Sequence, residues 1–169
     1  MDCKKRTKCA SQCASQWHTQ VLQGPIEIYI IHSVFLNNFS TSTRTVLRYL
    51  AWHSQNCEQF INFECNNDKA FIEDSNAWWV SRDGTRMNYW GGATGHDKMC
   101  ACGVTNSCTG GTKCNCDNSG SAGGSWYEDS GLLTDKSVLP VTQIRLGDLN
   151  GSGEEGYHTL GKLKCYGQA

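Results

Sequence analysis

Two pairs of oxygen-bearing side chains flank a glycine- and serine-rich run in the second half of the chain. Asp117 and Asn118 precede this run, and Glu128 and Asp129 follow it. Carboxylate and amide oxygens are the ligands that calcium takes in proteins, about six to eight at a time. The pattern therefore predicts a calcium site formed by these residues. A glycine-rich hairpin with solvated acids is the alternative, and the sequence favours neither.

A second oxygen-rich loop begins at Asp148 and includes Asn150. Its side-chain oxygens recur at alternate positions, and glycine stands at the sixth position, as in loops that fold around calcium. The twelfth position is Thr159, where an EF-hand loop has a bidentate glutamate. Asp148 and Asn150 are therefore the second choice of calcium ligands, with a solvated turn as the alternative.

Aromatic residues beside the first loop suggest that its ligand is a sugar. Two vicinal hydroxyls of a sugar can fill an open position in the coordination shell of calcium, and an aromatic ring can stack on the sugar's apolar face. Trp126 and Tyr127 stand next to Glu128 and are the predicted sugar contacts. His96, in a separate polar loop, is a further candidate for a sugar contact.

A catalytic site is less well supported by the residues. His96–Asp97 and Tyr157–His158 lie in polar stretches, but no nucleophile elbow, zinc-protease helix or phosphate loop accompanies them. Neighbours on a strand point to opposite faces, so Glu128 and Asp129 would not flank one glycosidic bond. We therefore predict that the protein is not an enzyme.

The cysteines predict disulfide bonds formed in an oxidising compartment. The chain has 11 cysteines and 18 glycines among 169 residues, which is typical of secreted proteins braced by disulfides. Zinc is a weaker interpretation of Cys100-x-Cys102 and Cys114-x-Cys116, because common zinc knuckles have two residues between their cysteines. An odd cysteine count leaves one thiol free, modified or bridged to another chain, which allows a disulfide-linked homodimer. The spacing does not give the connectivity.

Charge and hydropathy argue against two classes of protein. The 15 basic and 16 acidic residues give a formal net charge of −1, so no positive field gathers nucleic acid. The longest apolar segment, residues 26–36, is interrupted by Glu27 and His32, and it is shorter than the roughly 20 residues that span a bilayer. We predict a protein that neither binds nucleic acid nor inserts into a membrane.

Residues 1–61 are predicted to form an N-terminal arm, a strand and a helix. Residues 1–20 are polar and basic and contain several cysteines, which predicts an N-terminal arm, and residues 21–169 predict a single domain. Apolar alternation over residues 26–30 predicts a strand. Apolar residues at three- and four-residue spacing from Ser40 to Ile61 predict an amphipathic helix.

The chain after Cys65 is expected to consist mainly of loops. Short strands are predicted at residues 77–81 and 141–146, and long loops such as residues 105–125 are expected to be functional or held by cross-links. At least two of the four aromatics in Trp78–Trp79 and Tyr89–Trp90 are expected to fill the core. The predicted class is α+β: disulfide-rich, with short antiparallel strands, one main helix and long ordered loops.

An ordered set of motifs from Cys57 to Gly167 resembles the fibrinogen-like C-terminal segment of contactin-associated, neurexin-IV-type cell-surface proteins. The resemblance implies a fibrinogen-like domain. A departure from the adhesion members is the longer run from Asn118 to Ser125, where a binding function could be added. The matching pieces are Cys57-Glu58-Gln59, Cys65, Trp78-Trp79, Tyr89-Trp90-Gly91-Gly92, Cys100-x-Cys102-Gly103, Cys108, Cys114-Asn115-Cys116-Asp117, Trp126, Asp129-x-Gly131, Leu139-Pro140-Val141-Thr142-Gln143-Ile144 and Cys165-Tyr166-Gly167.

Fibrinogen-like lectins suggest what that added function would be. The run that ends in Trp126-Tyr127-Glu128 is similar to a loop of the intelectins, which, like the ficolins, use calcium. As a small free-standing chain, the sequence also resembles the calcium-dependent galactose-binding lectins of sea anemones. This resemblance implies a homodimeric lectin for terminal galactose, as in lactose, whose O3 and O4 form a cis-diol suited to chelation. The alternative is a non-enzymatic cell-adhesion module that binds protein and has solvated loop acids.

Overall fold

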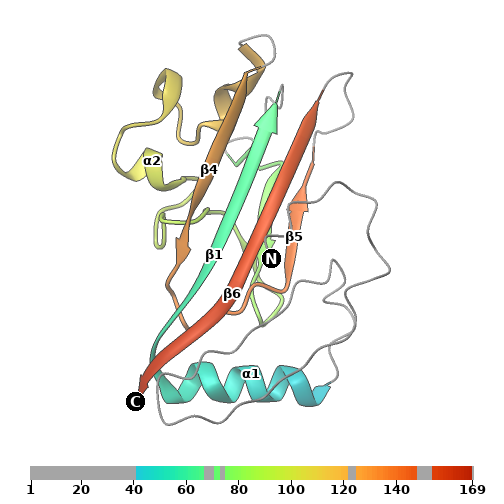
Figure 1. Cartoon of the computed structure of the whole chain (residues 1–169), viewed down its shortest axis with the longest axis vertical. Coiled ribbons are helices and arrows are strands. Elements are labelled where there is room, and N and C mark those ends of the chain that lie inside the picture. The colour runs from blue at the N-terminus through green and yellow to red at the C-terminus, as the bar shows by residue number, and fades with distance from the viewer. Residues whose placement is uncertain (1–40, 67–70, 73–74, 122–124, 148–153, 169) are drawn as a thin grey trace.

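The chain folds into two three-stranded antiparallel sheets with a helix across one end. The computed structural model describes residues 41–66, 71–72, 75–121, 125–147 and 154–168. One sheet has the strand order β4-β1-β6 and the other β3-β2-β5, and helix α1 lies across their lower end (Figure 1). The elements are α1 (Thr41–His53), β1 (Ser54–Asn66), β2 (Ala77–Val80), β3 (Arg86–Met87), α2 (Ala101–Val104), the 3-10 helices η2 (Thr109–Gly111) and η3 (Cys116–Ser121), β4 (Trp126–Leu133), β5 (Gln143–Leu146) and β6 (Glu155–Gln168). The predicted mixed, mostly antiparallel class is confirmed.

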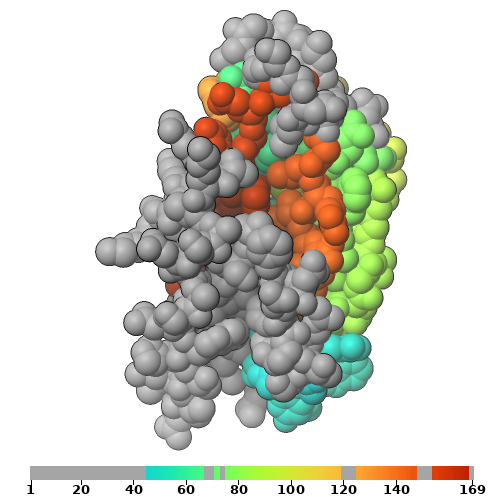
Figure 2. All heavy atoms as spheres, turned by 90° about the vertical axis from the view of Figure 1, so that its right-hand side faces the viewer, coloured from blue at the N-terminus to red at the C-terminus, as the bar shows by residue number. Residues whose placement is uncertain are grey.

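The two sheets enclose a shared core. The core cluster combines Ile61 and Phe63 of β1 with Trp79 of β2 and Leu163 of β6. Figure 2 views the molecule from the side, where β6 and β5, which belong to different sheets, lie next to each other above α1. The sequence prediction for the aromatics is confirmed, because Trp79 and Trp90 are fully buried.

The predicted helix from Ser40 to Ile61 is wrong in its second half. Helix α1 ends at His53, where the Ser54 hydroxyl donates a hydrogen bond to the Leu50 carbonyl oxygen (2.8 Å). The chain then continues as β1, whose alternate residues from Cys57 to Cys65 face the core. The apolar spacing of this segment suits a helix as well as a strand, and pairing with β4 on one side and β6 on the other selects the strand.

The predicted loops after Cys65 are also wrong at two places. Strand β4 and the 14-residue strand β6 form the two edges of the sheet around β1. The shorter strands expected at residues 77–81 and 141–146 are confirmed as β2 and β5. The strand expected at residues 26–30 and the N-terminal arm, residues 1–20, lie outside the described residues.

Disulfide bonds replace the zinc interpretation of the cysteine pairs. The four bonds are Cys57–Cys165, Cys65–Cys116, Cys100–Cys114 and Cys102–Cys108. They pair every cysteine of the described residues and hold the long segment between α2 and β4 to the core, as expected of a cross-linked loop. The remaining cysteines of the 11 in the chain lie in residues 1–20, outside the described residues. Within the part of the chain described, no helix is long and apolar enough to cross a membrane.

Candidate functional site

Strand β4 separates two of the predicted calcium ligands. Successive residues of a strand face opposite sides of the sheet, so Glu128 is exposed whereas Asp129 points into the protein and is 3% exposed. Alternation along a strand predicts this divergence. Glu128 is therefore in contact with solvent, whereas Asp129 is surrounded by protein, and the two side chains do not point to a common site.

The Asp129 carboxylate anchors the segment before η3. Its Oδ1 accepts the backbone N–H of Asn115 (3.0 Å), and its Oδ2 accepts that of Cys116 (2.8 Å). Burial raises the pKa of Asp129 to about 6, the two amide hydrogen bonds oppose this rise, and the nearby charge of Glu128 adds to it. Both carboxylate oxygens of Asp129 thus accept hydrogen bonds that hold the backbone of Asn115 and Cys116 against β4.

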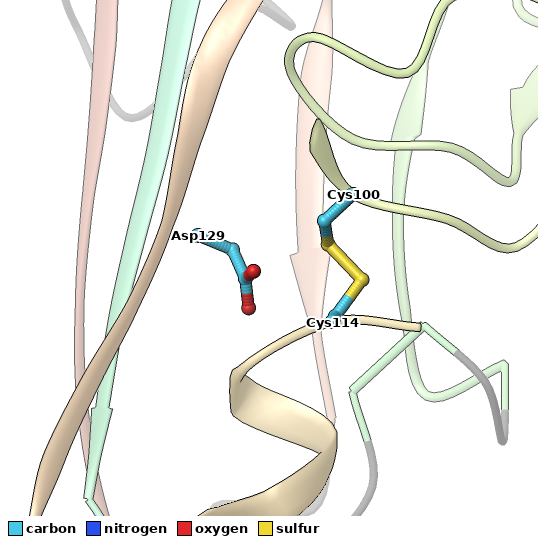
Figure 3. A group of neighbouring side chains, drawn as sticks. All are labelled: Cys100, Cys114 and Asp129. Atoms are coloured by element: carbon cyan, nitrogen blue, oxygen red, sulfur yellow. A yellow bond between two sulfur atoms is a disulfide. The ribbon is translucent and has the colours of Figure 1, made fainter. Parts of the chain in front are cut away.

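Asp129 also points toward the Cys100–Cys114 disulfide (Figure 3). Within the described residues, these three side chains form the one group of three His, Cys, Asp or Glu residues whose ligand atoms lie within 4.8 Å of one another. A metal binds the thiolate form of cysteine, and both sulfurs here are consumed in a disulfide. The group is therefore a structural contact and not a metal centre.

Asp117 and Asn118, at the start of η3, turn toward other parts of the fold. Asp117 Oδ1 accepts the backbone N–H of Phe71 (2.9 Å), and the Asn118 side chain packs against Gly110. The carboxylates of Asp117, Glu128 and Asp129 are not brought into one close group. His96 is exposed in the loop before α2. Asp148 and Asn150 lie outside the described residues, so the second loop stays a prediction.

The β4-β1-β6 sheet presents a continuous face away from the core, which we name the outer face. Asn62, Glu64 and Asn66 are its central residues on β1. Glu64 pairs with Glu128 on β4 and with Tyr157 on β6. Asn66 pairs with Trp126 on β4 and with Glu155 on β6. Residues that pair across neighbouring strands share a face, so acids, amides and aromatic rings gather here.

The rings of Trp126 and Tyr157 stack on the outer face, with centroids 5.3 Å apart and planes inclined by 21°. The two residues come from strands that β1 separates, so both rings lean inward and meet above β1. Tyr127, the aromatic partner expected from the sequence, is instead half-buried against the core. From the sequence, Tyr157 was considered only beside His158 as a weak catalytic candidate in a polar loop, and not as a partner of Trp126 on a strand. Alternation along that strand would have indicated it.

The outer face is rich in hydrogen-bond acceptors. Glu58 is paired with Lys164 (3.9 Å), whereas Glu64, Glu128 and Glu155 have no ion-pair partner among the described residues. Glu64 Oε1 accepts a hydrogen bond from Asn62 Nδ2 (3.4 Å). The side-chain oxygens of Asn62 and Asn66 are buried and have no hydrogen-bond partner within the part described. Like charges directly opposite each other on a sheet repel, so Glu64 and Glu128 form an acidic pair on this face.

Comparisons with known proteins indicate a relationship over part of the chain. The chain is 39% identical over 122 residues to rat (Rattus norvegicus) Contactin-associated protein 1, a match that covers 70% of this chain and 9% of the relative. It is 36% identical over 124 residues to Neurexin-4 of Drosophila melanogaster, covering 68% of this chain and 9% of the relative.

The match to human (Homo sapiens) Contactin-associated protein 1 is longer, at 35% identity over 155 residues, 89% of this chain and 11% of the relative. The chain thus spans about a tenth of the length of these relatives. No protein-family model matches it, and no solved structure matches it significantly. The predicted relationship to contactin-associated, neurexin-IV-type proteins is confirmed, and the resemblance to sea anemone lectins stays a prediction.

Proposed function

We propose that this chain is a non-enzymatic, extracellular recognition domain that binds a protein partner at a cell surface. Its relatives include Neurexin-4 and a contactin-associated protein, and the second name describes association with another protein and not a reaction. Disulfides are rare inside the cytosol and common outside it, so the bonds of this fold support an extracellular place.

The observation that carries this proposal is the composition of the outer face. Large apolar side chains stand partly exposed along it: Phe60, Trp126, Leu132, Tyr157 and Tyr166, which are 36–46% exposed. Aromatic residues gathered on a solvent-facing surface mark interaction sites, and tyrosine and tryptophan are enriched among the residues that dominate binding energy. A twisted sheet held by disulfides presents them on a rigid support.

A second candidate function is a calcium-dependent lectin for terminal galactose. The specific observation that favours it is the stacked Trp126–Tyr157 pair beside Glu64 and Glu128, since lectin sites combine a ring for the sugar's apolar face with oxygen ligands. The proposed ligands are galactosides such as lactose. A homodimer would present two such sites and convert weak single-site affinity into avidity.

Competition at intact cells separates the two functions. We expect fluorescently labelled chain to bind cells, to lose this binding after the cells are treated with trypsin, and to keep it in excess lactose or glucose. Inhibition by lactose but not by glucose would contradict the protein-partner proposal and support the lectin. Calorimetry of the purified chain with lactose and glucose, each with calcium and then with a chelator, measures the sugar interaction directly.

A further inference from the structure

We propose that the outward face of the β3-β2-β5 sheet binds an acidic segment of a partner protein through the guanidinium groups of Arg86 and Arg145. This face, which we name the arginine face, consists of Trp78, Val80, Arg86, Gln143 and Arg145. It lies on the opposite side of the molecule from the outer face, because the two sheets enclose one core. The inference goes beyond the proposed function and does not rest on it.

Strand pairing places both arginines beside Trp78. Arg145 on β5 is the direct partner of Trp78 on β2. Arg86 on β3 is the direct partner of Val80, two residues further along β2. Trp79, between Trp78 and Val80, is fully buried in the core. Because neighbours along a strand alternate between the two faces of a sheet, Trp78, Val80 and their cross-strand partners point away from the core.

Arg86 is held over the ring of Trp78. Its guanidinium carbon lies 4.1 Å from the ring centroid, which is a cation–π contact. Its Nε donates a hydrogen bond to Asn88 Oδ1 (3.1 Å), and its Nη2 donates to the Ser75 carbonyl oxygen (2.8 Å). These bonds use the Nε–Nη2 edge of the group. Its Nη1 has no hydrogen-bond partner among the described residues.

Arg145 is held along the same edge by its neighbour on β5. Its Nε and its Nη2 both donate to Gln143 Oε1, at 3.0 Å and 2.6 Å. Its Nη1 likewise has no hydrogen-bond partner in the part of the chain described. A guanidinium group has five N–H donors in a fixed, planar arrangement. Each arginine is therefore oriented by the protein and still has donors for a ligand.

No acid of the described residues pairs with either arginine. Asp83, in the turn between β2 and β3, pairs instead with Arg48 (3.3 Å) and Arg82 (3.5 Å). The acceptors that hold Arg86 and Arg145 are carbonyl and amide oxygens, which carry no net charge. The two positive charges of the arginine face therefore remain available to an anionic ligand.

The arrangement of the two arginines fits several carboxylates on one extended segment. A guanidinium edge binds a carboxylate through two parallel hydrogen bonds, and such charge-assisted bonds are about twice as strong as neutral ones. The backbones of β3 and β5 flank β2, so they are about 9–10 Å apart, twice the spacing of strands. A segment with repeated acids can therefore engage both arginines. The formal net charge of −1 gives the chain no general attraction for acids, so such binding requires a local site.

Fluorescence anisotropy of a labelled hexaglutamate peptide tests the site on the intact, disulfide-bonded chain. We expect binding that weakens as ionic strength rises, because salt screens exposed charges, and no binding of hexaglutamine with the same label. Arg86→Gln and Arg145→Gln should each weaken binding at least about tenfold, since each removes charge-assisted hydrogen bonds. Arg145→Lys keeps the charge but not the planar edge, so its affinity should fall between those of the original chain and Arg145→Gln.

Two control variants exclude a general effect of positive charge. Arg48→Gln removes an exposed arginine that is paired with Asp83, and it should bind the peptide within about twofold of the original chain. Lys4→Gln/Lys5→Gln removes two basic residues near the start of the sequence, and it should also bind as the original chain does. Circular dichroism confirms that each variant is folded.

Three results would overturn the inference. The first is absence of hexaglutamate binding at millimolar concentration. The second is loss of binding in Lys4→Gln/Lys5→Gln together with retention in Arg86→Gln and Arg145→Gln. The third is tighter binding of a heparin hexasaccharide than of hexaglutamate at the same two arginines, which would assign the site to sulfated glycans instead of an acidic protein segment. Peptide binding is measured without cells, so its failure would leave the proposed function of the outer face unaffected.

Discussion

Replacing Gly131 with alanine is expected to lower the free energy of unfolding by about 3 kcal/mol or more, the cost of overpacking a site whose neighbours are backbone. A Cβ at Gly131 would lie 2.5 Å from the Gly91 carbonyl carbon and 2.7 Å from the Gly92 nitrogen. Gly92 N–H also donates to the Leu132 carbonyl (2.8 Å), so β4 and the loop after Trp90 are in direct backbone contact. Neither side can yield by rotating a side chain.

Equilibrium unfolding in urea with the disulfides intact measures this cost. Gly95→Ala is the control, because its Cβ would meet nothing within 4 Å and only its backbone φ of +83° resists the change. That strain costs about 1 kcal/mol. If Gly131→Ala proved no more destabilising than Gly95→Ala, the close approach of β4 to this loop would be wrong. If the Gly131→Ala variant fails to fold whereas the Gly95→Ala variant folds, this result supports the close approach of β4 to the loop.

Acidification is expected to stabilise the chain through Asp129. Burial raises the pKa of this carboxyl from its ordinary value of 3.8 to about 6, so between these values the folded state holds a proton that the unfolded state has released. Stability from this group is fully present below the unfolded pKa and is lost as the pH rises through about 6. The shift corresponds to about 3 kcal/mol across this window.

Asp129→Asn isolates the contribution, because asparagine has nearly the same shape and does not titrate. The difference in unfolding free energy between the original chain and the variant should change by about 2 kcal/mol, in favour of the original chain, from pH 7 to pH 4, because the unfolded carboxyl is itself partly protonated at pH 4. A constant difference, or one of opposite sign, would contradict a raised pKa. If the variant does not fold, the carboxyl carbon shift of Asp129 followed by NMR reports the same pKa.

Local patterns predicted the parts of the fold that depend on nearby residues. Alternation located β2 and β5, and the crowded cysteines indicated disulfides instead of zinc. Residues 54–61 could not be assigned in this way, because the spacing of their apolar residues fits the 3.6-residue period of a helix as well as the two-residue period of a strand. Partners far along the chain decide them, as in the pairing of Cys57 with Cys165, 108 residues away.

The candidate site was predicted only in part for the same reason. Trp126 and Glu128 were predicted to contact a ligand, which stays a prediction, and their neighbours on the outer face come from β1 and β6, which were expected as helix and loop. The sequence also did not show that Asp129, unlike its neighbour Glu128, has a structural role. Strand alternation showed that Glu128 and Asp129 would diverge, but the two amides that Asp129 anchors become apparent only once the segment before η3 has folded against β4.

Cell binding by two variants is the most direct test of recognition through the outer face. The double variant Trp126→Ala/Tyr157→Ala removes the stacked rings, and Trp52→Ala removes a tryptophan that is 71% exposed on α1. We expect the double variant to bind at least about tenfold more weakly, as for residues central to an interface, and Trp52→Ala to bind within about twofold of the original chain. Unchanged binding by a folded double variant, with loss in Trp52→Ala, would place recognition on the helix and contradict the proposal.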